Sequence, residues 1–340
     1  MSREQVSAPL CGKPTRRIVA WSIARITAGL RGKRSATGGV VAAITPVHCG
    51  SQSAVLPSDA LAKNPTDKGV ITMYPFTYQR ATGLAEAVAG LKADPQAKAL
   101  AGGMTLLPSM KHRLAAPSSL IDIARLAELR GIRRDGKSLV VGAATRHGEL
   151  TADPIAQSAI AALAHLAGLI GDPQVRARGT LGGSVANNDP AADYPAAVLA
   201  CRAQIVTDRR SIAADDFFQG MFTTALAADE LITAIRFECP RRAAYAKFAQ
   251  AASGYAMTGV FVAQFDDAVR VAVTGAGPGV FHWEAAERAL SADFSTRSLA
   301  ALSMPADGLN ADQHAPADYR AHLVKLMTLR AVADIIGATA

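Results

Sequence analysis

Two glycine-rich segments of the chain have the residue types and the spacing to hold an anion. The first, AGGMT at Ala101–Thr105, follows a short apolar stretch and precedes a helical one. Its amide groups and the helix N-terminus can therefore face phosphate oxygens with no side chain in the way. The second, GTLGGS at Gly179–Ser184, adds the hydroxyls of Thr180 and Ser184 where a backbone must approach a ligand closely. A tight turn explains either glycine pair alone, but together they predict a diphosphate held between two subdomains.

A third glycine-rich segment, GAGPG at Gly275–Gly279, resembles a dinucleotide-binding turn only superficially. Its third glycine comes too early, and Pro278 lacks an amide donor. No acidic residue follows at the distance that would bind a ribose. We therefore expect no Rossmann site in this chain.

The four cysteines, Cys11, Cys49, Cys201 and Cys239, form no CxxC pair and have no histidine at ligand spacing. They cannot assemble an iron–sulfur or zinc site within this chain. Cys201 and Cys239 stand in apolar surroundings, and we expect both to be small hydrophobic residues of the interior. No metal site is therefore predicted here.

The excess positive charge is confined to the first 72 residues. The chain carries a formal net charge of +8, and residues 1–72 contain ten Lys or Arg side chains against three acidic ones. The remaining 268 residues hold 26 basic and 25 acidic side chains. Because the body of the protein has no excess charge to neutralise a phosphate backbone, we expect no nucleic-acid binding.

Residues 1–72 show no sustained helical or strand period, and we expect a basic, disordered extension. Arg16-Arg17 before an apolar stretch allows a twin-arginine export signal, although Arg25 interrupts that stretch. An organellar transit peptide is a second interpretation. We favour a third, a start codon assigned too early, because convincing domain sequence begins at Met73. No apolar run reaches the length that spans a membrane, and we expect a cytoplasmic protein.

From Met73 onward, the hydrophobic pattern predicts alternating helices and strands. We expect a helix over 84–91, a strand over 98–100, a helix over 106–114 and a strand over 120–123. This alternation is typical of a small α/β unit with parallel strands.

The next segment predicts antiparallel pairing. Strands over 131–134 and 137–143 flank the turn pair Asp135-Gly136, which is typical of a hairpin. The pattern also predicts a long Ala- and Leu-rich helix over 154–170, a helix over 192–201, and strands over 203–207 and 230–237. We interpret this second unit as α+β.

The last third contains three predicted strands, over 244–249, 258–265 and 269–275. Helices follow. In the final helix, apolar residues recur every three or four positions at Leu323, Leu326, Leu329, Val332 and Ile336. We expect this apolar face to pack on the three-stranded sheet.

The flanks of the two anion-binding segments carry a resemblance to a known family. AGGMTLLPSMKHRLA at 101–115, GDPQVRARGTLGGSVANNDPAADYPAA at 171–197 and KFAQAASGYA at 247–256 resemble the FAD-binding medium subunit of the carbon monoxide dehydrogenase and xanthine dehydrogenase family. The resemblance extends from Met73 to about Ile336. It implies an α+β, PCMH-type FAD-binding fold. Two α/β subdomains at 73–128 and 129–242 would precede a C-terminal domain at 243–340, with a three-stranded antiparallel sheet and packed helices.

The resemblance also implies which residues hold the FAD diphosphate. They are the residues of the two glycine-rich segments, namely Ala101, Gly102, Gly103, Met104, Thr105, Thr180, Leu181, Gly182, Gly183 and Ser184. Met104 stands where the family often has His or Gln. We therefore expect a backbone contact at this position and no side-chain contact.

Four further residues match cofactor positions of the family, and each also has a plain structural interpretation. Asp193 of the DYP motif would contact the cofactor, or act as an acid at a helix N-terminus. Lys247 would lie near the flavin, or be a solvated lysine on a strand. Tyr255 would place its ring against the isoalloxazine, or be merely structural. Ile232 would line the cofactor pocket, or belong to a core strand.

The family's division of labour implies the function and the partners. A large molybdenum subunit would carry the molybdenum cofactor, and a small iron–sulfur subunit would carry two two-iron clusters. This chain would pass their electrons through FAD to a terminal acceptor, within a dimer of heterotrimers. A flavin suits this place because it takes up electrons singly and releases two together. A stand-alone FAD-dependent oxidase or dehydrogenase, and a non-enzymatic binding module, are the competing hypotheses.

Overall fold

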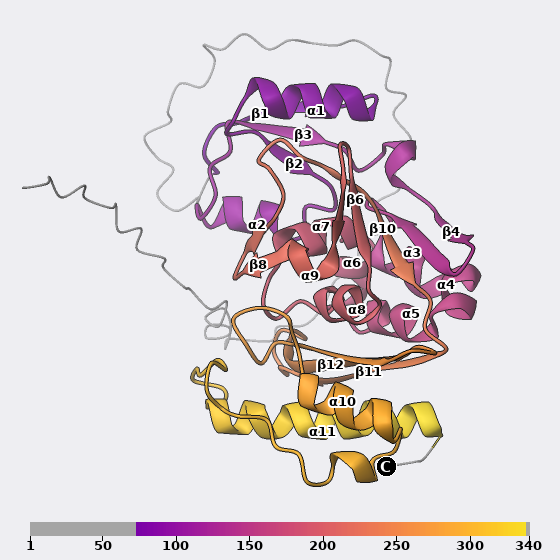
Figure 1. Cartoon of the computed structure of the whole chain (residues 1–340). Helices are drawn as coiled ribbons and strands as arrows, with labels where there is room; N and C mark the ends of the chain where they lie inside the picture. Colours follow the sequence, from indigo (N-terminus) through magenta and orange to yellow (C-terminus); the bar gives the residue numbers. More distant parts are fainter. Residues whose placement is uncertain (1–72, 338–340) are drawn as a thin grey trace, which may run out of the picture. The chain divides into compact units, whose positions relative to one another are not determined.

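The computed structural model describes residues 73–337 (Figure 1). The interpretations of residues 1–72, and of Cys11 and Cys49, lie outside the described residues. Between residues 73 and 337, no helix has the length and apolarity needed to cross a membrane.

A small parallel sheet opens the described chain, as the sequence predicts. Its strands lie in the order β1-β3-β2, and the helices α1 and α2 provide the two crossovers that parallel strands require. The bounds are β1 Thr77–Arg80, α1 Leu84–Ala93, β2 Lys98–Leu100, α2 Leu106–Lys111 and β3 Ser119–Asp122.

The helix α2 ends earlier than the apolar pattern suggests. It stops at Lys111, and Arg113 takes a left-handed φ of 57°. The amide of Leu114 then donates to the carbonyl oxygen of Ser109, which closes the helix end in the manner of a left-handed cap. Leu114 is 72% exposed, so its side chain makes too few apolar contacts to stabilise a longer helix. The prediction of a helix to residue 114 was therefore wrong at its end.

The second subdomain is built on a five-stranded antiparallel sheet in the order β4-β5-β10-β6-β7. The predicted hairpin is confirmed: β4 and β5 pair antiparallel across a turn in which Gly136 has a φ of +59°. The strand bounds are β4 Ile132–Asp135, β5 Ser138–Gly142, β6 Gln204–Thr207, β7 Ser211–Ala213 and β10 Ile232–Glu238.

Short helices connect these strands. The bounds are α3 His147–Ala152, α4 Pro154–Ala159, α5 Ala161–Gly168, α6 Pro173–Arg176, α7 Leu181–Asn187, α8 Tyr194–Ala200 and α9 Ala214–Phe217. A two-stranded hairpin of β8 Phe218–Gly220 and β9 Thr223–Thr224 follows α9.

The long helix predicted over 154–170 is in fact two helices. Ile160 breaks it, with φ −146° and ψ 77°, between α4 and α5. Ile160 is 3% exposed and lies in the same core cluster as Ala156 before it and Leu163 after it. The break turns the chain so that apolar residues of both helices reach one core, which a single straight helix of this composition would not achieve.

The C-terminal sheet has four strands where the sequence predicted three. Its order is β11-β12-β13-β14, with all neighbours antiparallel. The additional strand, β14, is only two residues long, which is too short to show a periodic pattern. The remaining bounds are β11 Arg242–Ala249, β12 Ala256–Gln264, β13 Val269–Thr274, β14 Phe281–His282, α10 Glu284–Ala292 and α11 Ala317–Ile336.

Helices cover both faces of this sheet (Figure 1). The helices α10 and α11 pack on one face, and α5 and α8 of the second subdomain contact the other. Alternate strand residues accordingly belong to different cores: Tyr245 and Phe261 join the core of the second subdomain, whereas Ala246 and Val260 pack towards α11.

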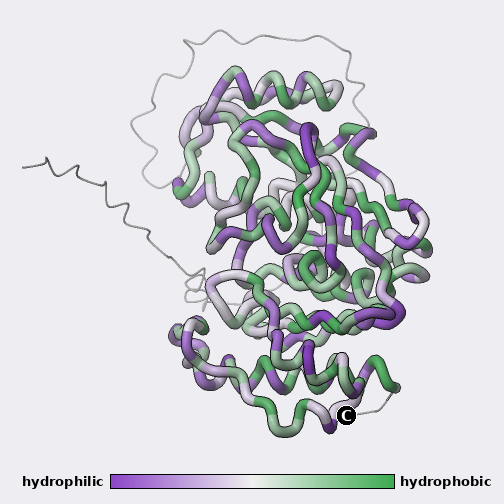
Figure 2. Tube along the Cα trace, in the orientation of Figure 1, coloured by the Kyte–Doolittle hydropathy of each residue, from purple (hydrophilic) through white to green (hydrophobic). Residues whose placement is uncertain are grey.

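The apolar face predicted for α11 is confirmed only in part: Leu323 and Val332 are buried and Leu326 and Leu329 are half-buried, but Ile336, at the last position of the helix, is 42% exposed. Figure 2 shows hydrophobic and hydrophilic stretches alternating along α11.

Candidate functional site

The two glycine-rich segments lie in direct contact. An added methyl group at Gly102 would lie 2.2 Å from the carbonyl oxygen of Arg178 and 2.8 Å from the Cα of Gly179. Only glycine permits this approach, because any other residue would place its Cβ inside the neighbouring backbone. The sequence predicted that the two segments act on one ligand, and the structure places them side by side.

The first segment offers unpaired backbone donors. It connects β2 to α2, and Gly103 turns the chain with a φ of +72°. Within residues 73–337, the amides of Gly102, Gly103, Met104 and Thr105 donate no hydrogen bond to the protein. Consecutive free amides beside a helix start form a concave site for an anion. Met104 is 37% exposed, so its side chain does not close this site.

The second segment has its amides satisfied by the protein itself. It runs antiparallel to residues 143–147, and its N–H groups bond to that segment or to the Thr180 cap of α7. The bonds run from Leu181 to Thr145 O (3.0 Å), Gly182 to Ala143 O (2.8 Å), Gly183 to Thr180 Oγ1 (3.2 Å) and Ser184 to Thr180 O (3.1 Å). These four amides therefore cannot serve as free anion donors as those of the first segment can.

The two paired glycines of the second segment have different surroundings. A methyl group at Gly182 would lie 2.5 Å from the Cβ of Ala143, so glycine is required here to let the neighbouring backbone at Ala143 approach. Gly183 is exposed, and Ser184 is half-buried. The Ser184 hydroxyl makes no hydrogen bond to any other described residue. Gly183 and Ser184 are therefore the members of this segment that a ligand can reach.

Asp193 and Lys247 form a buried ion pair. Their nearest atoms, Lys247 Nζ and Asp193 Oδ1, lie 2.9 Å apart, and each side chain is 4% exposed. The Tyr245 hydroxyl donates to the same carboxylate, and Lys247 Nζ also donates to the carbonyl oxygen of Leu169. Burial raises the pKa of Asp193, which the Lys247 ammonium opposes. The interpretation of Lys247 as a solvated strand lysine was wrong, because its ammonium is enclosed.

Asp193 does stand at the start of α8, as its structural interpretation held, but its side chain does not cap that helix. The carboxylate instead bonds to β11. Tyr245 donates the hydrogen bond in this group because burial, followed by the charge of Asp193, raises its pKa well above the usual value. Sequence reasoning missed Tyr245 because no spacing signal links a strand tyrosine to the distant DYP motif.

Tyr255 lies close to this charged group at the turn between β11 and β12. Its side chain is 39% exposed. Burial raises its pKa, and the charges of Asp189 and Asp193 add to the effect. Ile232, by contrast, is 5% exposed in the main core at the first position of β10, where its core interpretation is sufficient.

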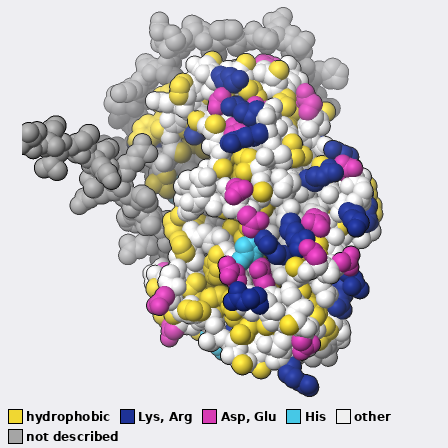
Figure 3. All heavy atoms as spheres, viewed as in Figure 1, with side chains coloured by type: hydrophobic (Ala, Val, Ile, Leu, Met, Phe, Trp, Pro, Cys, Tyr) yellow, Lys and Arg dark blue, Asp and Glu magenta, His cyan; other side chains and the backbone are white. Residues whose placement is uncertain are grey.

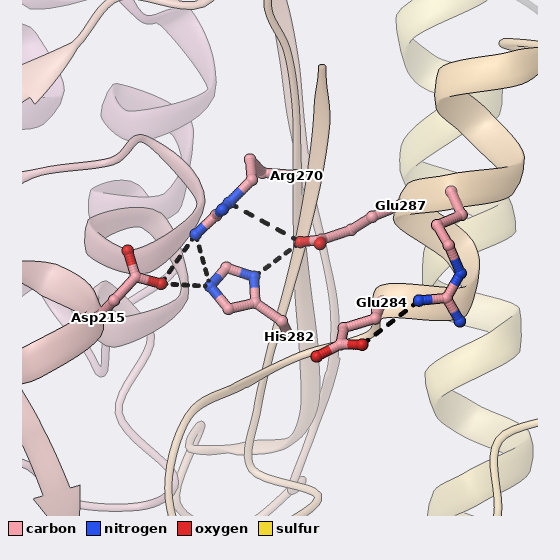
Figure 4. Close-up of a pocket in the computed structure, with 6 residues that line it drawn as sticks. Asp215, Arg270, His282, Glu284 and Glu287 are labelled. Carbon is pink, nitrogen blue, oxygen red and sulfur yellow. Dashed lines mark hydrogen bonds and ion pairs between the residues drawn. The ribbon is translucent and has the colours of Figure 1, made fainter.

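A separate charged cavity of about 380 Å³ lies where α9, the C-terminal sheet and α10 meet (Figure 4). His282 stands between Asp215 and Glu287, at 3.0 and 2.7 Å, and Arg270 Nη2 lies 2.8 Å from Asp215. Glu287 is also within 3.9 Å of Arg270, and Glu284 pairs with Arg288, so each carboxylate of the cavity already has a partner within the protein. Charges of both signs are also interspersed over the face shown in Figure 3. No group of three or more metal-ligating side chains is positioned for a metal within 73–337.

The two cysteines within the described residues, Cys201 and Cys239, differ in burial. Cys201 is fully buried, as predicted, and burial raises the pKa of its thiol. Cys239 is half-buried and packs at the edge of the same core. Both are free thiols.

Comparison with known proteins identifies this arrangement. The family model described as the FAD binding domain in molybdopterin dehydrogenase matches residues 74–239. The carbon monoxide dehydrogenase medium chain of Hydrogenophaga pseudoflava is 36% identical over 278 residues, covering 76% of this chain and 96% of that one. The glyceraldehyde dehydrogenase medium chain of Sulfolobus acidocaldarius is 31% identical over 288 residues, covering 77% and 100%.

Solved structures agree. Carbon monoxide dehydrogenase from Hydrogenophaga pseudoflava lacking the Mo-pyranopterin moiety gives a TM-score of 0.71 at 36% identity, over 79% of this chain and all of that one. Quinoline 2-oxidoreductase from Pseudomonas putida 86 gives a TM-score of 0.72 at 27% identity with the same coverage. The resemblance seen in the sequence is thus confirmed, and the chain belongs to the family of FAD-binding medium subunits of molybdenum hydroxylases, of the carbon monoxide and xanthine dehydrogenase type.

Proposed function

We propose that this chain carries electrons, by way of FAD, from the iron–sulfur clusters of a small partner subunit to a terminal acceptor. A large partner subunit with the molybdenum cofactor would oxidise the substrate. The observation that carries the proposal is the row of free amides at Gly102–Thr105, pressed against the second glycine-rich segment. Such a row fits a diphosphate and has no partner within the described protein.

The residues of this chain divide the work of holding FAD. The free amides of Gly102–Thr105 would hold the diphosphate, with Gly183 and the Ser184 hydroxyl alongside. Tyr255, whose pKa is raised by burial and by the charges of Asp189 and Asp193, would flank the flavin ring. Bound FAD supplies the redox chemistry, because a flavin exchanges electrons singly or in pairs. The protein contributes binding, orientation and exclusion of water.

The partners follow from what the described chain does not contain. Neither described cysteine belongs to a cluster motif, and no metal site is formed between residues 73 and 337. Relatives such as the nicotine 6-hydroxylase medium subunit are named as one subunit of several. We infer a dimer of heterotrimers in the cytoplasm, with export of the whole complex by a twin-arginine route as the alternative location.

Purification tests the proposal directly. The chain expressed alone should be yellow and contain close to one FAD per protein, and it should co-purify with iron–sulfur and molybdenum subunits when these are expressed with it. Reduction of its flavin should require those partners. A colourless chain that takes up no FAD would contradict the cofactor assignment, and turnover of an organic substrate by the chain alone would favour a stand-alone oxidase.

A further inference from the structure

His147 lies directly beneath the second glycine-rich segment. It is the first residue of α3 and is 4% exposed. Its backbone amide donates to the carbonyl oxygen of Gly179 at 3.0 Å. A methyl group at Gly179 would lie 2.5 Å from His147 Nε2, so the imidazole packs against the Gly179 backbone. No other side chain lies closer to the point where a Gly179 Cβ would stand.

Tyr194 fixes the orientation of this imidazole. Its hydroxyl oxygen lies 3.1 Å from His147 Nδ1, and the two ring centroids are 5.3 Å apart. Tyr194 is fully buried at the first position of α8 and directly follows Asp193. The contact therefore joins the buried group of Asp193 and Lys247 to the segment that begins at Gly179.

The imidazole is uncharged at neutral pH. Burial, followed by the charge of Arg176, lowers the pKa of His147 to about 4. A neutral imidazole has one donor and one acceptor nitrogen, so a single hydroxyl at Nδ1 can satisfy that nitrogen in either tautomer. The Arg176 guanidinium is itself held by the carbonyl oxygens of Ile170 and Gly171.

We propose that His147, oriented by Tyr194, is a positioning residue for FAD: its imidazole supports the backbone at Gly179 and keeps this backbone in contact with Gly102, where the free amides would hold the diphosphate. The inference rests on the proposed FAD site and adds a residue to it. His147 does not touch the cofactor in this role. It acts through Gly179, so its effect is on FAD affinity.

Titration of the full chain with FAD tests the inference. Tyr194→Phe, which removes one oxygen atom, should weaken FAD binding about fivefold, the loss that corresponds to one buried hydrogen bond. His147→Ala should weaken binding more. His147→Asn should fall between the wild type and His147→Ala, because asparagine can place a polar atom where Nδ1 lies but lacks Nε2, the atom nearest to Gly179. Thr328→Val is the matched control, since Thr328 is a buried hydroxyl in α11, far from the segment, and should bind FAD as the wild type does.

The outcomes separate the inference from the function on which it rests. A wild type that binds FAD, together with a Tyr194→Phe variant of equal affinity, overturns the positioning role and leaves the FAD site standing. Equal losses in His147→Asn and His147→Ala also overturn it, because the hydrogen bond to Tyr194 would then contribute nothing, and wild-type affinity in His147→Asn overturns it because the Nε2 contact with Gly179 would be unnecessary. A wild type that binds no FAD overturns both proposals. If His147→Ala fails to fold, shown by its circular dichroism, the Tyr194→Phe comparison decides.

Discussion

Gly102 meets the carbonyl oxygen of Arg178 so closely that the two glycine-rich segments, which belong to different subdomains, touch through backbone atoms at this point. We call this contact the seam. The free amides at Gly102–Thr105 are positioned by it, since the first segment is braced by the second.

Gly102→Ala should therefore abolish tight FAD binding. The added methyl group would meet a backbone carbonyl, which cannot rotate away, and the two segments must separate. Overpacking of this kind costs about 1–3 kcal/mol, which corresponds to an affinity about five- to 150-fold weaker. Fluorescence titration with FAD measures the effect. Gly279→Ala is the control, because a methyl group there meets nothing within 4 Å, and equal affinities in the two variants would refute the seam.

Lys247→Met should destabilise the fold strongly. It leaves the Asp193 carboxylate buried without its cation, a change that typically costs about 3–5 kcal/mol. The double variant Asp193→Asn with Lys247→Met should lose less than the sum of the two single changes, because no unpaired charge remains. Urea unfolding followed by circular dichroism gives the free energies. Strict additivity would show that the pair does not interact.

His147 should make the protein less stable in mild acid. Its pKa is about 4 in the folded chain and 6.5 without the fold, so the unfolded state binds more protons between these values. The stabilising contribution is complete above pH 6.5 and is lost as the pH falls towards about 4, which amounts to about 3 kcal/mol.

The difference between the wild type and His147→Asn isolates this contribution from the carboxylates that also titrate in acid. Unfolding free energies measured from pH 4 to 7.5 should converge at the acid end and diverge towards neutrality. Parallel curves for the two proteins would be inconsistent with a buried neutral histidine.

Gly259→Ala and Tyr245→Phe should be coupled. Gly259 pairs with Lys247 across β11 and β12, and a methyl group there would lie 2.3 Å from the Tyr245 hydroxyl oxygen. The single change Gly259→Ala should cost about 1–3 kcal/mol by overpacking. Tyr245→Phe removes this contact but also the hydrogen bond to Asp193, so each single variant should be less stable than the wild type. Thermal unfolding should show the double variant to lose less than the sum of the two single losses, and strict additivity would contradict the contact.

Elements with a strong local signal could be predicted from the sequence. The β4–β5 hairpin follows from its Asp135-Gly136 turn, and the parallel sheet follows from alternating periods. Other elements carry no such signal. All four residues of β1 have exposed side chains, so no alternation marks the strand, and it was not predicted. The helix break at Ile160 depends on the packing of this residue in the main core, against residues that are distant in the sequence.

The glycines of the candidate site could be predicted from the sequence, but the hydrogen-bond and ion-pair partners of its residues could not. The sequence shows two glycine-rich segments, but it does not show that residues 143–147 and Thr180 accept the hydrogen bonds of the amides in the second one. Lys247 likewise looks like any strand lysine until Asp193 is found against it. Hydrogen bonds and ion pairs between segments far apart in the chain depend on the tertiary fold, which local spacing does not encode.

The buried ion pair also bears on how this chain can be divided. The recognised FAD-binding region ends at residue 239, whereas Lys247 and Tyr245, which satisfy the Asp193 carboxylate, lie beyond it on β11. A fragment cut at that boundary would lack Tyr245 and Phe261, so the core residues that they cover would be exposed. It would also leave the Asp193 carboxylate without a counter-ion. The C-terminal sheet therefore cannot be removed as an independent module. A chimera that replaces it with the sheet of a relative must keep a tyrosine at position 245 and a lysine at position 247.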